Sequence, residues 1–332
     1  MGSANPTYLR TTNTHCSYCA RETREKVRAD RMIRHLPENK VFGGTLRIVE
    51  CAECGLRYLN PMPDLRDLGQ IYDYDVYEDS TNNNPVLMEH FYSSLKQHTR
   101  NLRTVLEIGC GTGEFLSFLE SKGIEATGVE FADSAKRVKF KGKLLIGRME
   151  DIDIPDASFD GVLLLNVIEH LSDPLSVLVK IRKMLAPGGT LLLRQPNSDM
   201  FFNKLYRPMV EFPKYLVHRA LHARNKKTGF TVLGFQNQHL YYFNRRSVTQ
   251  LLKRAGFEVA AYGTVDPYNR KRMVKSLKTG NLIEGGVATI RHVLGYVGLG
   301  PESLTVATVP APAGEAVPRP PSDRAPAHAQ MS

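Results

Sequence analysis

The chain has 332 residues, 42% of them hydrophobic and 23% charged, as in a globular protein of one large or two smaller domains. This composition excludes a chain that is disordered throughout. The sequence contains no run of about 18 apolar residues, so no membrane-spanning helix is predicted. The net charge is +10, but residues 201–300 alone hold 17 basic and 4 acidic residues, a net charge of +13. Any anionic partner is therefore expected near that third of the chain.

The first 62 residues contain two Cys-x2-Cys pairs, Cys16 with Cys19 and Cys51 with Cys54. Each pair brings two thiolates to one ion, and four thiolates form a tetrahedral, closed structural zinc site. The apolar stretch that ends at Cys51 predicts a strand leading into the second pair. We therefore predict a zinc-ribbon-like subdomain over 1–62. Two disulfides, free thiols or a redox role are the alternatives, and disulfides are disfavoured because no secretion signal is visible.

Residues 63–100 follow as a predicted helical linker or cap, and a strand, a glycine loop and a helix come next. The β-rich run VLEI (105–108) predicts the strand, GCGTG (109–113) is the loop, and a helix with an apolar face continues the chain. A second strand, EATGVE, ends at Glu130. This order is the first half of a doubly wound α/β sheet, which binds ligands at the carboxyl ends of its strands.

The loop sequence separates two classes of cofactor. A dinucleotide fingerprint needs glycine at position 114, which is Glu114 here. The loop reads G-x-G-x-G instead and is preceded by Glu107, whose carboxylate suits a cofactor with a cationic amino acid end. Glu130, 21 residues after Gly109, is placed to accept hydrogen bonds from both hydroxyls of a ribose.

The segment VLEIGCGTG resembles the core motif of the class I S-adenosylmethionine-dependent methyltransferases. The resemblance continues to about residue 309, with a fourth strand at Asp160–Leu165, a helix capped by Ser172 or Asp173, and later strands in APGGTLLLRQPN, FEVAAYGTV and SLTVATV. It implies an α/β fold with a doubly wound, Rossmann-like, seven-stranded methyltransferase sheet over 101–309, joined to the N-terminal zinc-ribbon subdomain.

The resemblance also implies which residues hold S-adenosylmethionine. The glycines of the loop and the acid before them would bind its methionine part, and the acid that ends the second strand would bind its ribose. The residues after the third strand would contact its adenine. The residue after the fourth strand would border the methyl group. These residues are Glu107, Gly109, Gly111, Gly113, Glu130, Met149, Glu150 and Asn166. Arg148 stands where relatives often have an acid that contacts adenine, so adenine recognition is expected to use backbone groups.

Three residues are candidates for catalysis. His170 lies past the fourth strand, where an acid/base residue would face the acceptor, and Glu169 would orient it or act as a second acid/base group. An architectural role for this Glu-His pair is the alternative. His239 precedes the late helix, where a histidine reaches the acceptor in similar methyltransferases, or fixes the surrounding segment by hydrogen bonds. Tyr72, Tyr74 and Tyr77 either lie over the methyl site, as the resemblance implies, or pack in an ordinary way.

A basic, aromatic insertion occupies residues 198–238 and interrupts the path from the fifth strand to the late helix. It fits a substrate lid that holds a phosphate, an anionic membrane surface, a nucleic-acid contact or a solvated helical cap. The lid is favoured because the insertion falls on the acceptor side of the sheet. Residues 310–332 are rich in proline and alanine and are expected to be disordered and functionally quiet.

These features predict a cytoplasmic methyltransferase with structural Zn²⁺ that transfers a methyl group to oxygen or carbon of a sugar-like or secondary-metabolite acceptor. The resemblance is to bacterial small-molecule methyltransferases. A phosphorylated or nucleotide-linked acceptor and a peripheral membrane contact stay open, and nucleic acid is not the expected partner. The alternatives are an RNA methyltransferase that uses the insertion, and a non-catalytic interaction protein that binds the cofactor.

Overall fold

The computed structural model describes residues 11–12, 16, 18–19, 25–32, 45–63, 85–130, 138–199, 239–265 and 300–310. Three predicted features lie outside these residues: the three tyrosines, nearly all of the basic insertion, and the tail from residue 311. The described strands form one seven-stranded sheet, one four-stranded sheet and a short β1–β5 pair, with β1 at Thr11–Thr12 and β5 at Met62–Pro63.

The seven-stranded sheet has the strand order β12-β13-β10-β9-β6-β7-β8. Its strands are β6 (Thr104–Ile108), β7 (Glu125–Glu130), β8 (Lys143–Ile146), β9 (Phe159–Leu165), β10 (Leu185–Pro196), β12 (Glu258–Val265) and β13 (Glu302–Thr308). The five strands from β10 to β8 pair in parallel, while β13 runs antiparallel to both neighbours. The predicted seven-stranded, doubly wound sheet is confirmed.

Consecutive residues of the central strands point into two separate cores. Leu106 and Leu164 join one apolar cluster, whereas Val105 and Leu163 join the other, as the two-residue period of a strand requires. The first cluster contains residues of α5 and α7, and the second contains residues of α2 and α3. The helices are α2 (Pro85–His98), α3 (Glu114–Ser121), α5 (Pro174–Met184) and α7 (Arg245–Arg254). The sheet is therefore covered by helices on both faces.

The strand order reverses between β6 and β9, which are neighbours although β7 and β8 come between them in the chain. In open α/β sheets, ligands bind at this point, outside the carboxyl ends of the strands. The glycine loop leaves β6 here, and the short 3-10 helix η3 (Ile168–His170) follows β9. Most of the predicted site residues are thus brought to one edge of the sheet.

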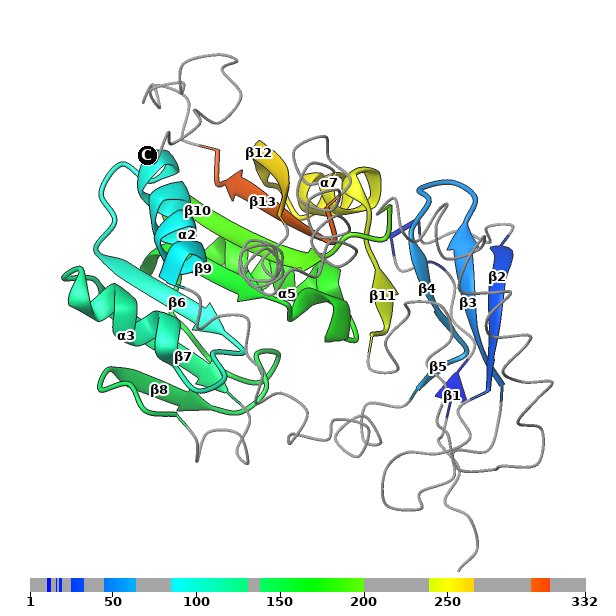
Figure 1. The fold of residues 1–332 in the computed structure, drawn as a ribbon, viewed down its shortest axis with the longest axis horizontal. Coiled ribbons are helices and arrows are strands. Elements are labelled where there is room, and N and C mark those ends of the chain that lie inside the picture. Colours follow the sequence, from blue (N-terminus) through cyan, green and yellow to red (C-terminus); the bar gives the residue numbers. More distant parts are fainter. Residues whose placement is uncertain are drawn as a thin grey trace, which may run out of the picture.

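The four-stranded sheet lies beside the larger one, and its edge strand β11 is the strand nearest to the larger sheet (Figure 1). It contains β2 (Glu25–Met32), β3 (Thr45–Cys51) and β4 (Arg57–Asn60), all from the N-terminal region, and β11 (Tyr241–Tyr242). β11 belongs to the predicted methyltransferase segment, yet it pairs antiparallel with β4. The two predicted domains therefore share a sheet, and their division at residue 62 stays a prediction.

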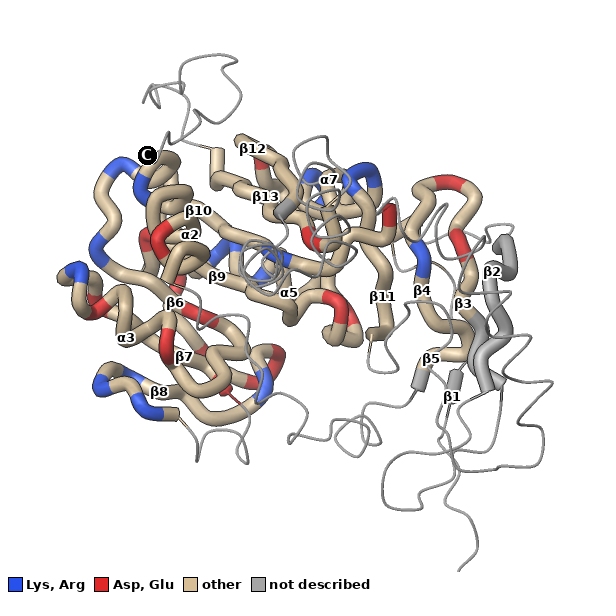
Figure 2. Tube along the Cα trace, viewed as in Figure 1, with Lys and Arg blue, Asp and Glu red and all other residues tan. Residues whose placement is uncertain are grey.

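Charged residues of both signs are interspersed along the described chain (Figure 2). Within the basic third of the sequence, residues 239–265 are described and carry four basic residues, two at the start of α7 and two at its end, and one acid, Glu258. Most of the +13 therefore belongs to residues outside the described part. None of the described helices is long and apolar enough to cross a membrane.

Candidate functional site

The loop after β6 has a left-handed backbone at each of its three glycines. The φ angles are +69° at Gly109, +56° at Gly111 and +81° at Gly113, a region that side chains with a Cβ rarely adopt. A Cβ at Gly109 would lie 2.6 Å from Cγ2 of Val167, whereas a Cβ at Gly111 would meet no atom of the described residues within 4 Å. Glycine is thus required for close packing at Gly109, and it leaves open space beside the backbone at Gly111.

Glu107 is the fourth residue of β6 and is buried, with 1% of its surface exposed. Neither carboxylate oxygen has a hydrogen-bond partner among the described residues. Burial raises the pKa of this carboxyl well above its usual range, and the neighbouring Glu130 and Glu114 add to the rise. A buried carboxylate without donors is costly, so Glu107 is suited to a cationic ligand group that supplies the missing partner.

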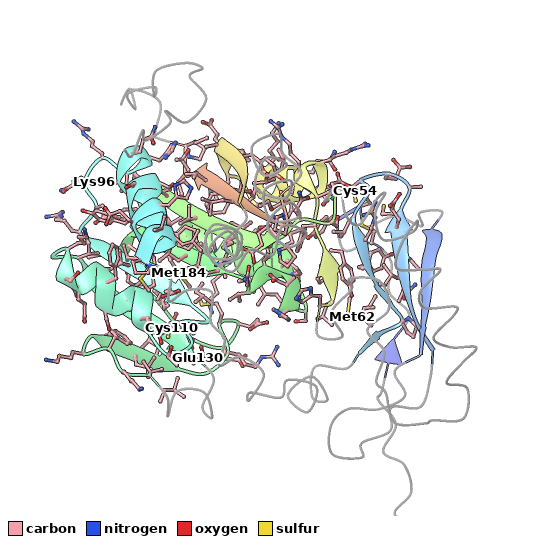
Figure 3. All side chains as sticks on the ribbon, in the orientation of Figure 1. Cys54, Met62, Lys96, Cys110, Glu130 and Met184 are labelled. Atoms are coloured by element: carbon pink, nitrogen blue, oxygen red, sulfur yellow. The ribbon has the colours of Figure 1, made fainter. Side chains whose placement is uncertain are left out.

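Glu130 ends β7 and lies close to the glycine loop, with Cys110 near it (Figure 3). Its Oε2 accepts a hydrogen bond of 2.7 Å from the backbone N–H of Gly111. The backbone N–H groups of Gly109 and Cys110 both point to the carbonyl of Val129 in the same strand. The loop and the end of β7 are therefore fixed to each other, which brings the predicted ribose ligand next to the predicted methionine-binding loop.

The segment after β8 is held by a lysine from α5. The Nζ atom of Lys180 donates hydrogen bonds to the carbonyls of Met149, Glu150 and Ile152, at 2.9, 3.0 and 2.6 Å. The Met149 side chain is buried, and Glu150 forms an ion pair of 3.3 Å with Arg148. The sequence pattern pointed to Met149 and Glu150, but it contained no sign that Lys180 organises their backbone.

Asn166, directly after β9, has a left-handed backbone with φ +59°. Its N–H donates to the carbonyl of Arg194 at 2.9 Å, and its buried side-chain Oδ1 has no hydrogen-bond partner within the described chain. Asparagine tolerates this conformation better than most residues, but the strain persists only where the surroundings impose it. The next residue is Val167, which contacts the glycine loop, so Asn166 is fixed at the point where the strand order reverses.

Glu169, His170 and His239 form one cluster. The Nε2 atoms of His170 and His239 lie 3.9 and 4.0 Å from Oε1 of Glu169, and the two rings meet edge to face at 4.8 Å between centroids. Glu169 is 1% exposed, and no described residue forms a hydrogen bond to either of its oxygens. Burial raises the pKa of its carboxyl to about 8. The nearby N–H of its own backbone opposes the rise, Glu302 adds to it and Arg194 opposes it. The structure thus brings the three catalytic candidates together.

The cluster is tied to the four-stranded sheet through the backbone. The N–H of Leu240 donates to the carbonyl of Glu169 at 2.8 Å, and the N–H of Leu59 in β4 donates to the carbonyl of Leu240 at 2.9 Å. Arg57, also in β4, donates to the carbonyl of Ser198 at 3.1 Å. The position of His239 next to Glu169 therefore depends on the N-terminal region.

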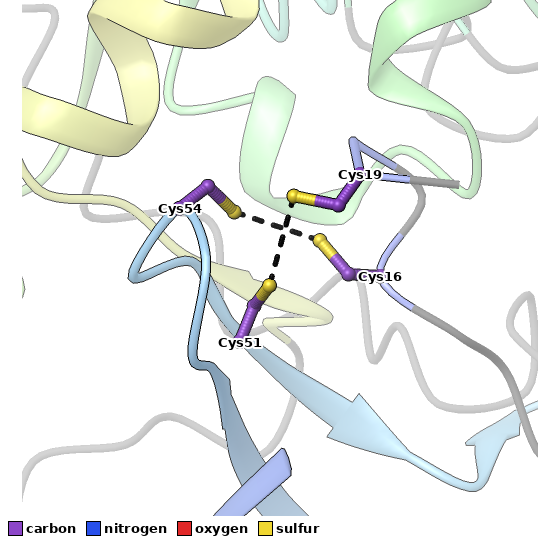
Figure 4. A group of neighbouring side chains, drawn as sticks. All are labelled: Cys16, Cys19, Cys51 and Cys54. Atoms are coloured by element: carbon purple, nitrogen blue, oxygen red, sulfur yellow. Dashed lines mark hydrogen bonds between the residues drawn. The ribbon is translucent and has the colours of Figure 1, made fainter. Parts of the chain in front are cut away.

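The four cysteines of the N-terminal region gather with their sulfurs facing one point (Figure 4). The Sγ atoms of Cys16 and Cys54 are 3.6 Å apart, and those of Cys19 and Cys51 are 3.7 Å apart. A disulfide needs a separation of about 2.05 Å, so these cysteines are not disulfide-bonded. Four sulfurs about 2.3 Å from one zinc ion lie roughly 3.8 Å apart, so the spacing fits a zinc site made of four thiolates.

A family model described as "Methyltransferase domain" matches residues 81–262, more than half of the 332-residue chain. The chain belongs to this family. The matched residues include the glycine loop, the segment after β8 and the Glu169–His170–His239 cluster, but not the four cysteines. Membership in the methyltransferase-domain family thus accounts for most of the seven-stranded sheet, with β13 outside the matched residues, and leaves the four cysteines outside the match as well.

Two curated relatives of this methyltransferase-domain protein have informative names. It is 31% identical over 117 residues to the ubiquinone biosynthesis O-methyltransferase of Idiomarina loihiensis, which covers 32% of this chain and 48% of that protein. It is 27% identical over 161 residues to a probable S-adenosylmethionine-dependent methyltransferase of Mycolicibacterium smegmatis, with 47% and 52% covered. The chain thus spans about half the length of each of these relatives.

Among solved structures, an S-adenosylmethionine-dependent methyltransferase from Archaeoglobus fulgidus aligns with a TM-score of 0.45 and 17% identity. The alignment covers 71% of this chain and all of that chain, 100%. The strand order and the family model, rather than this alignment, establish the fold of the methyltransferase domain.

Proposed function

We propose that the protein is an S-adenosylmethionine-dependent methyltransferase that acts on a small-molecule acceptor, methylating oxygen or carbon. The observation that carries the proposal is Glu107, a buried carboxylate without hydrogen-bond donors from the described residues, at the glycine loop of a methyltransferase-domain protein. When bound, the cofactor supplies an already activated methyl group, so the protein mainly has to position the acceptor.

The residues at the sheet edge fit this cofactor. Glu107 would face its cationic amino group, Gly111 has space beside its backbone, and Glu130 closes the loop from the other strand. Met149 and Glu150 would border the adenine, on a backbone that Lys180 holds in place. Asn166 would lie nearest the methyl group. These roles, predicted from the sequence, are all compatible with the geometry of the described residues.

Glu169, His170 and His239 would receive the acceptor. Glu169 and His170 follow Val167, whose side chain lies against Gly109 of the glycine loop, so an acceptor bound to the cluster would lie near the proposed cofactor site. An oxygen or carbon acceptor loses a proton during methylation, and these are polar groups in a position to manage it. We therefore keep the three residues as the acceptor-binding and acid/base candidates.

We also propose that the four cysteines hold a structural zinc ion. The set is closed, because four sulfurs already complete a tetrahedron and leave no position for a substrate. Tyr18, between Cys16 and Cys19, stacks on Tyr241 and Phe243 at 6.3 and 6.4 Å between ring centroids. Zinc would thus support the acceptor side of the site without taking part in the chemistry.

The acceptor class is a sugar-like compound or secondary metabolite, as the resemblance to bacterial small-molecule methyltransferases suggests. A phosphorylated or nucleotide-linked acceptor would match the basic charge of the insertion. An RNA acceptor would make binding fall steeply as salt rises, whereas a small neutral acceptor would give a nearly flat response. The cytoplasmic location stays a prediction.

The cofactor proposal is tested by two glycine-to-alanine variants. Gly111→Ala and Gly188→Ala both place alanine at a positive φ, +56° and +75°, and neither new Cβ meets a described atom within 4 Å. Each should destabilise the fold by about 1–2 kcal/mol, because the left-handed backbone is strained for alanine. Only Gly111→Ala should weaken S-adenosylmethionine binding, at least tenfold in calorimetry, because its Cβ would occupy the space meant for the cofactor.

Equal cofactor affinity in the two variants would argue against the proposed binding mode. Turnover is then measured as methyl release with candidate sugar and metabolite acceptors. Cofactor binding without methyl release on any acceptor would support the non-catalytic alternative instead.

A further inference from the structure

Glu169 is a buried acid beside two imidazoles, and no described residue donates a hydrogen bond to either of its oxygens. Buried carboxylates are normally paired or hydrogen-bonded, because burying one without a partner costs on the order of several kcal/mol. Its carboxylate and the two imidazoles nevertheless stand too far apart for hydrogen bonds, at 3.9 and 4.0 Å. The three side chains therefore leave a position between them for a group that could contact the Glu169 carboxylate and both imidazoles.

The spacing of the three ligand atoms fits a metal ion. Their nitrogen and oxygen atoms all lie within 4.8 Å of one another. Two of the three separations are 3.9 and 4.0 Å and the third is at most 4.8 Å. A point equidistant from the three atoms therefore lies roughly 2.3–2.5 Å from each, slightly beyond the metal–ligand distances of about 2.0–2.2 Å for imidazole and carboxylate. A small inward shift of the side chains would complete the coordination, and Oε1 of Glu169 faces both histidines.

The backbone holds the three residues in place. The N–H of His170 donates to the carbonyl of Val167 at 2.9 Å, and the N–H of Leu240 donates to the carbonyl of Glu169 at 2.8 Å. Glu169 and His170 are consecutive in the 3-10 helix η3, and His239 directly precedes the segment that joins the four-stranded sheet. Ligands that are fixed before binding lose little entropy when an ion enters.

The charges around the cluster leave its carboxylate available to a cation. Arg194 and Glu302 both act on Glu169, but they form a buried ion pair with each other. Arg194 also lies over the ring of Phe91, 5.6 Å from its centroid. The positive charge of Arg194 is therefore compensated by Glu302, and the carboxylate of Glu169 stays available to a metal cation.

We propose that Glu169, His170 and His239 bind a divalent first-row transition-metal ion such as Zn²⁺, Mn²⁺ or Co²⁺. Two imidazoles and one carboxylate are a ligand set that such ions favour. Three protein ligands leave at least one coordination position, unlike the closed four-cysteine site.

This site deepens the proposed function and rests on it. The open position would take a hydroxyl oxygen of the acceptor and lower the pKa of that hydroxyl, as a metal does for bound water. The O–H bond would break with its electron pair left on the oxygen, and the proton would pass to water. The oxygen would then form the bond to the methyl carbon while the carbon–sulfur bond of the cofactor breaks and its electron pair goes to sulfur. The preferred acceptor would therefore be a hydroxyl compound, and methylation would be at oxygen. The imidazoles would then act as ligands rather than as acid/base groups.

The first test counts metal on the intact wild-type chain. The protein is stripped of metal, reloaded with Co²⁺ and titrated with absorption spectroscopy. The proposal expects two Co²⁺ per chain, one with thiolate-to-metal charge-transfer bands from the four cysteines and one with only the weak bands of nitrogen and oxygen ligands. A single Co²⁺ with thiolate bands would overturn it, and this result needs no variant.

The second test assigns the ion to the cluster. Glu169→Gln keeps the size of the side chain, and it should weaken binding of the second Co²⁺ at least tenfold while the thiolate bands persist. Cys51→Ser should remove the thiolate bands and also weaken the second ion, because it loosens β11, next to which His239 lies. His90→Gln, which changes an exposed histidine on α2, should leave both ions bound. Unchanged binding of the second ion in Glu169→Gln would overturn the proposal.

Cofactor binding is measured on the same samples, so that the two proposals fail separately. A second Co²⁺ without S-adenosylmethionine binding would support the metal site and contradict the proposed function. Cofactor binding and methyl release with one Co²⁺ would contradict the metal site and return the three residues to acid/base roles.

Discussion

The two sides of the site are built in different ways. The main part of the proposed cofactor side comes from one continuous stretch, in which β6, the glycine loop, α3 and β7 follow one another from Thr104 to Glu130. Met149, Glu150 and Asn166 are added to it from later segments. The proposed acceptor side combines three distant segments, namely the residues after β9, those around β11, and β4 of the N-terminal region. A short-range motif is therefore enough to define most of the proposed cofactor side, whereas the proposed acceptor side exists only after the whole chain has folded.

The apolar core reflects the same difference. One continuous cluster runs from Cys16 and Tyr18 through Tyr241 and Phe243 to α5 and α7. The proposed cofactor side is divided between the clusters: Phe115 and Leu116 belong to the other one, with α2, whereas Ile108 and Val129 belong to the first. Damage to the N-terminal region should therefore affect the proposed acceptor side more than the proposed cofactor side. Four predictions test this separation.

The largest effect is expected for Cys51→Ser. Loss of one thiolate should release the zinc ion and loosen β3, β4 and β11, which hold His239 beside Glu169. Turnover should fall at least tenfold, while S-adenosylmethionine affinity changes less than about twofold. Zinc content, turnover and calorimetric affinity are measured together. As a zinc control, Cys110→Ala removes the fifth cysteine and should keep the ion bound.

Lys180→Met should have the next largest effect, on the cofactor side. It removes the donor to the carbonyls of Met149, Glu150 and Ile152, which should cost about 2–3 kcal/mol of stability and about tenfold in cofactor affinity. Lys183→Met, on an exposed position of the same helix, is the matched control. An unchanged unfolding free energy in Lys180→Met would show that these hydrogen bonds do not order the segment.

A smaller effect is expected in the pH dependence of cofactor binding. In the free protein the pKa of Glu107 is raised, first by burial and then by Glu130 and Glu114, so the folded state holds a proton that the unfolded state loses at lower pH. The contribution of Glu107 to stability therefore falls as pH rises above the ordinary pKa of a glutamate.

A cationic cofactor group favours the ionised carboxylate, so S-adenosylmethionine binding should release a proton and become tighter as pH rises. Calorimetry in two buffers with different ionisation heats measures the released proton. Glu107→Gln should abolish the release. Proton uptake by the wild type on binding would contradict the assigned role of Glu107.

The smallest effect is expected for Tyr18→Phe. The ring stacks on Tyr241 and Phe243, but its buried hydroxyl has no hydrogen-bond partner in the part of the chain that the structure describes. Removing the hydroxyl should leave stability unchanged or raise it by up to about 1 kcal/mol, whereas Tyr18→Ala should cost about 3–5 kcal/mol. Thermal unfolding compares the two, and a clear loss of stability in Tyr18→Phe would mean that the hydroxyl is bonded in solution.

Local patterns in the sequence predicted the first strand, the glycine loop, the helix and the second strand, and the resemblance to class I methyltransferases implied the seven-stranded sheet. Alternating apolar residues, the glycine spacing and the cap at Asp173, whose carboxylate accepts the N–H of Ser176, all act within a few residues. The two Cys-x2-Cys pairs likewise predicted that four thiols would meet, because ligand spacing is a local property. Roles of individual site residues stay predictions.

Long-range contacts were not predictable in this way. Lys180 is one of several lysines and arginines on α5, and only its position opposite three carbonyls gives it a function. The pairing of β11 with β4 joins residues about 180 positions apart, which no short pattern encodes. The sequence also does not show that Glu169 lacks hydrogen-bond donors among the described residues, because this depends on which distant residues surround its side chain in the folded protein.

The pairing of β11 with β4 limits how this protein can be divided or recombined. If the N-terminal region were removed, the edge of β11 would be left without its neighbour, and the aromatic faces of Tyr241 and Phe243 would lose the ring of Tyr18 that covers them. Exposed strand edges and apolar surface patches of this kind promote aggregation. The cysteine-bearing region is thus an integral part of the fold, and its transfer into another protein of the methyltransferase-domain family would have to include residues 239–243.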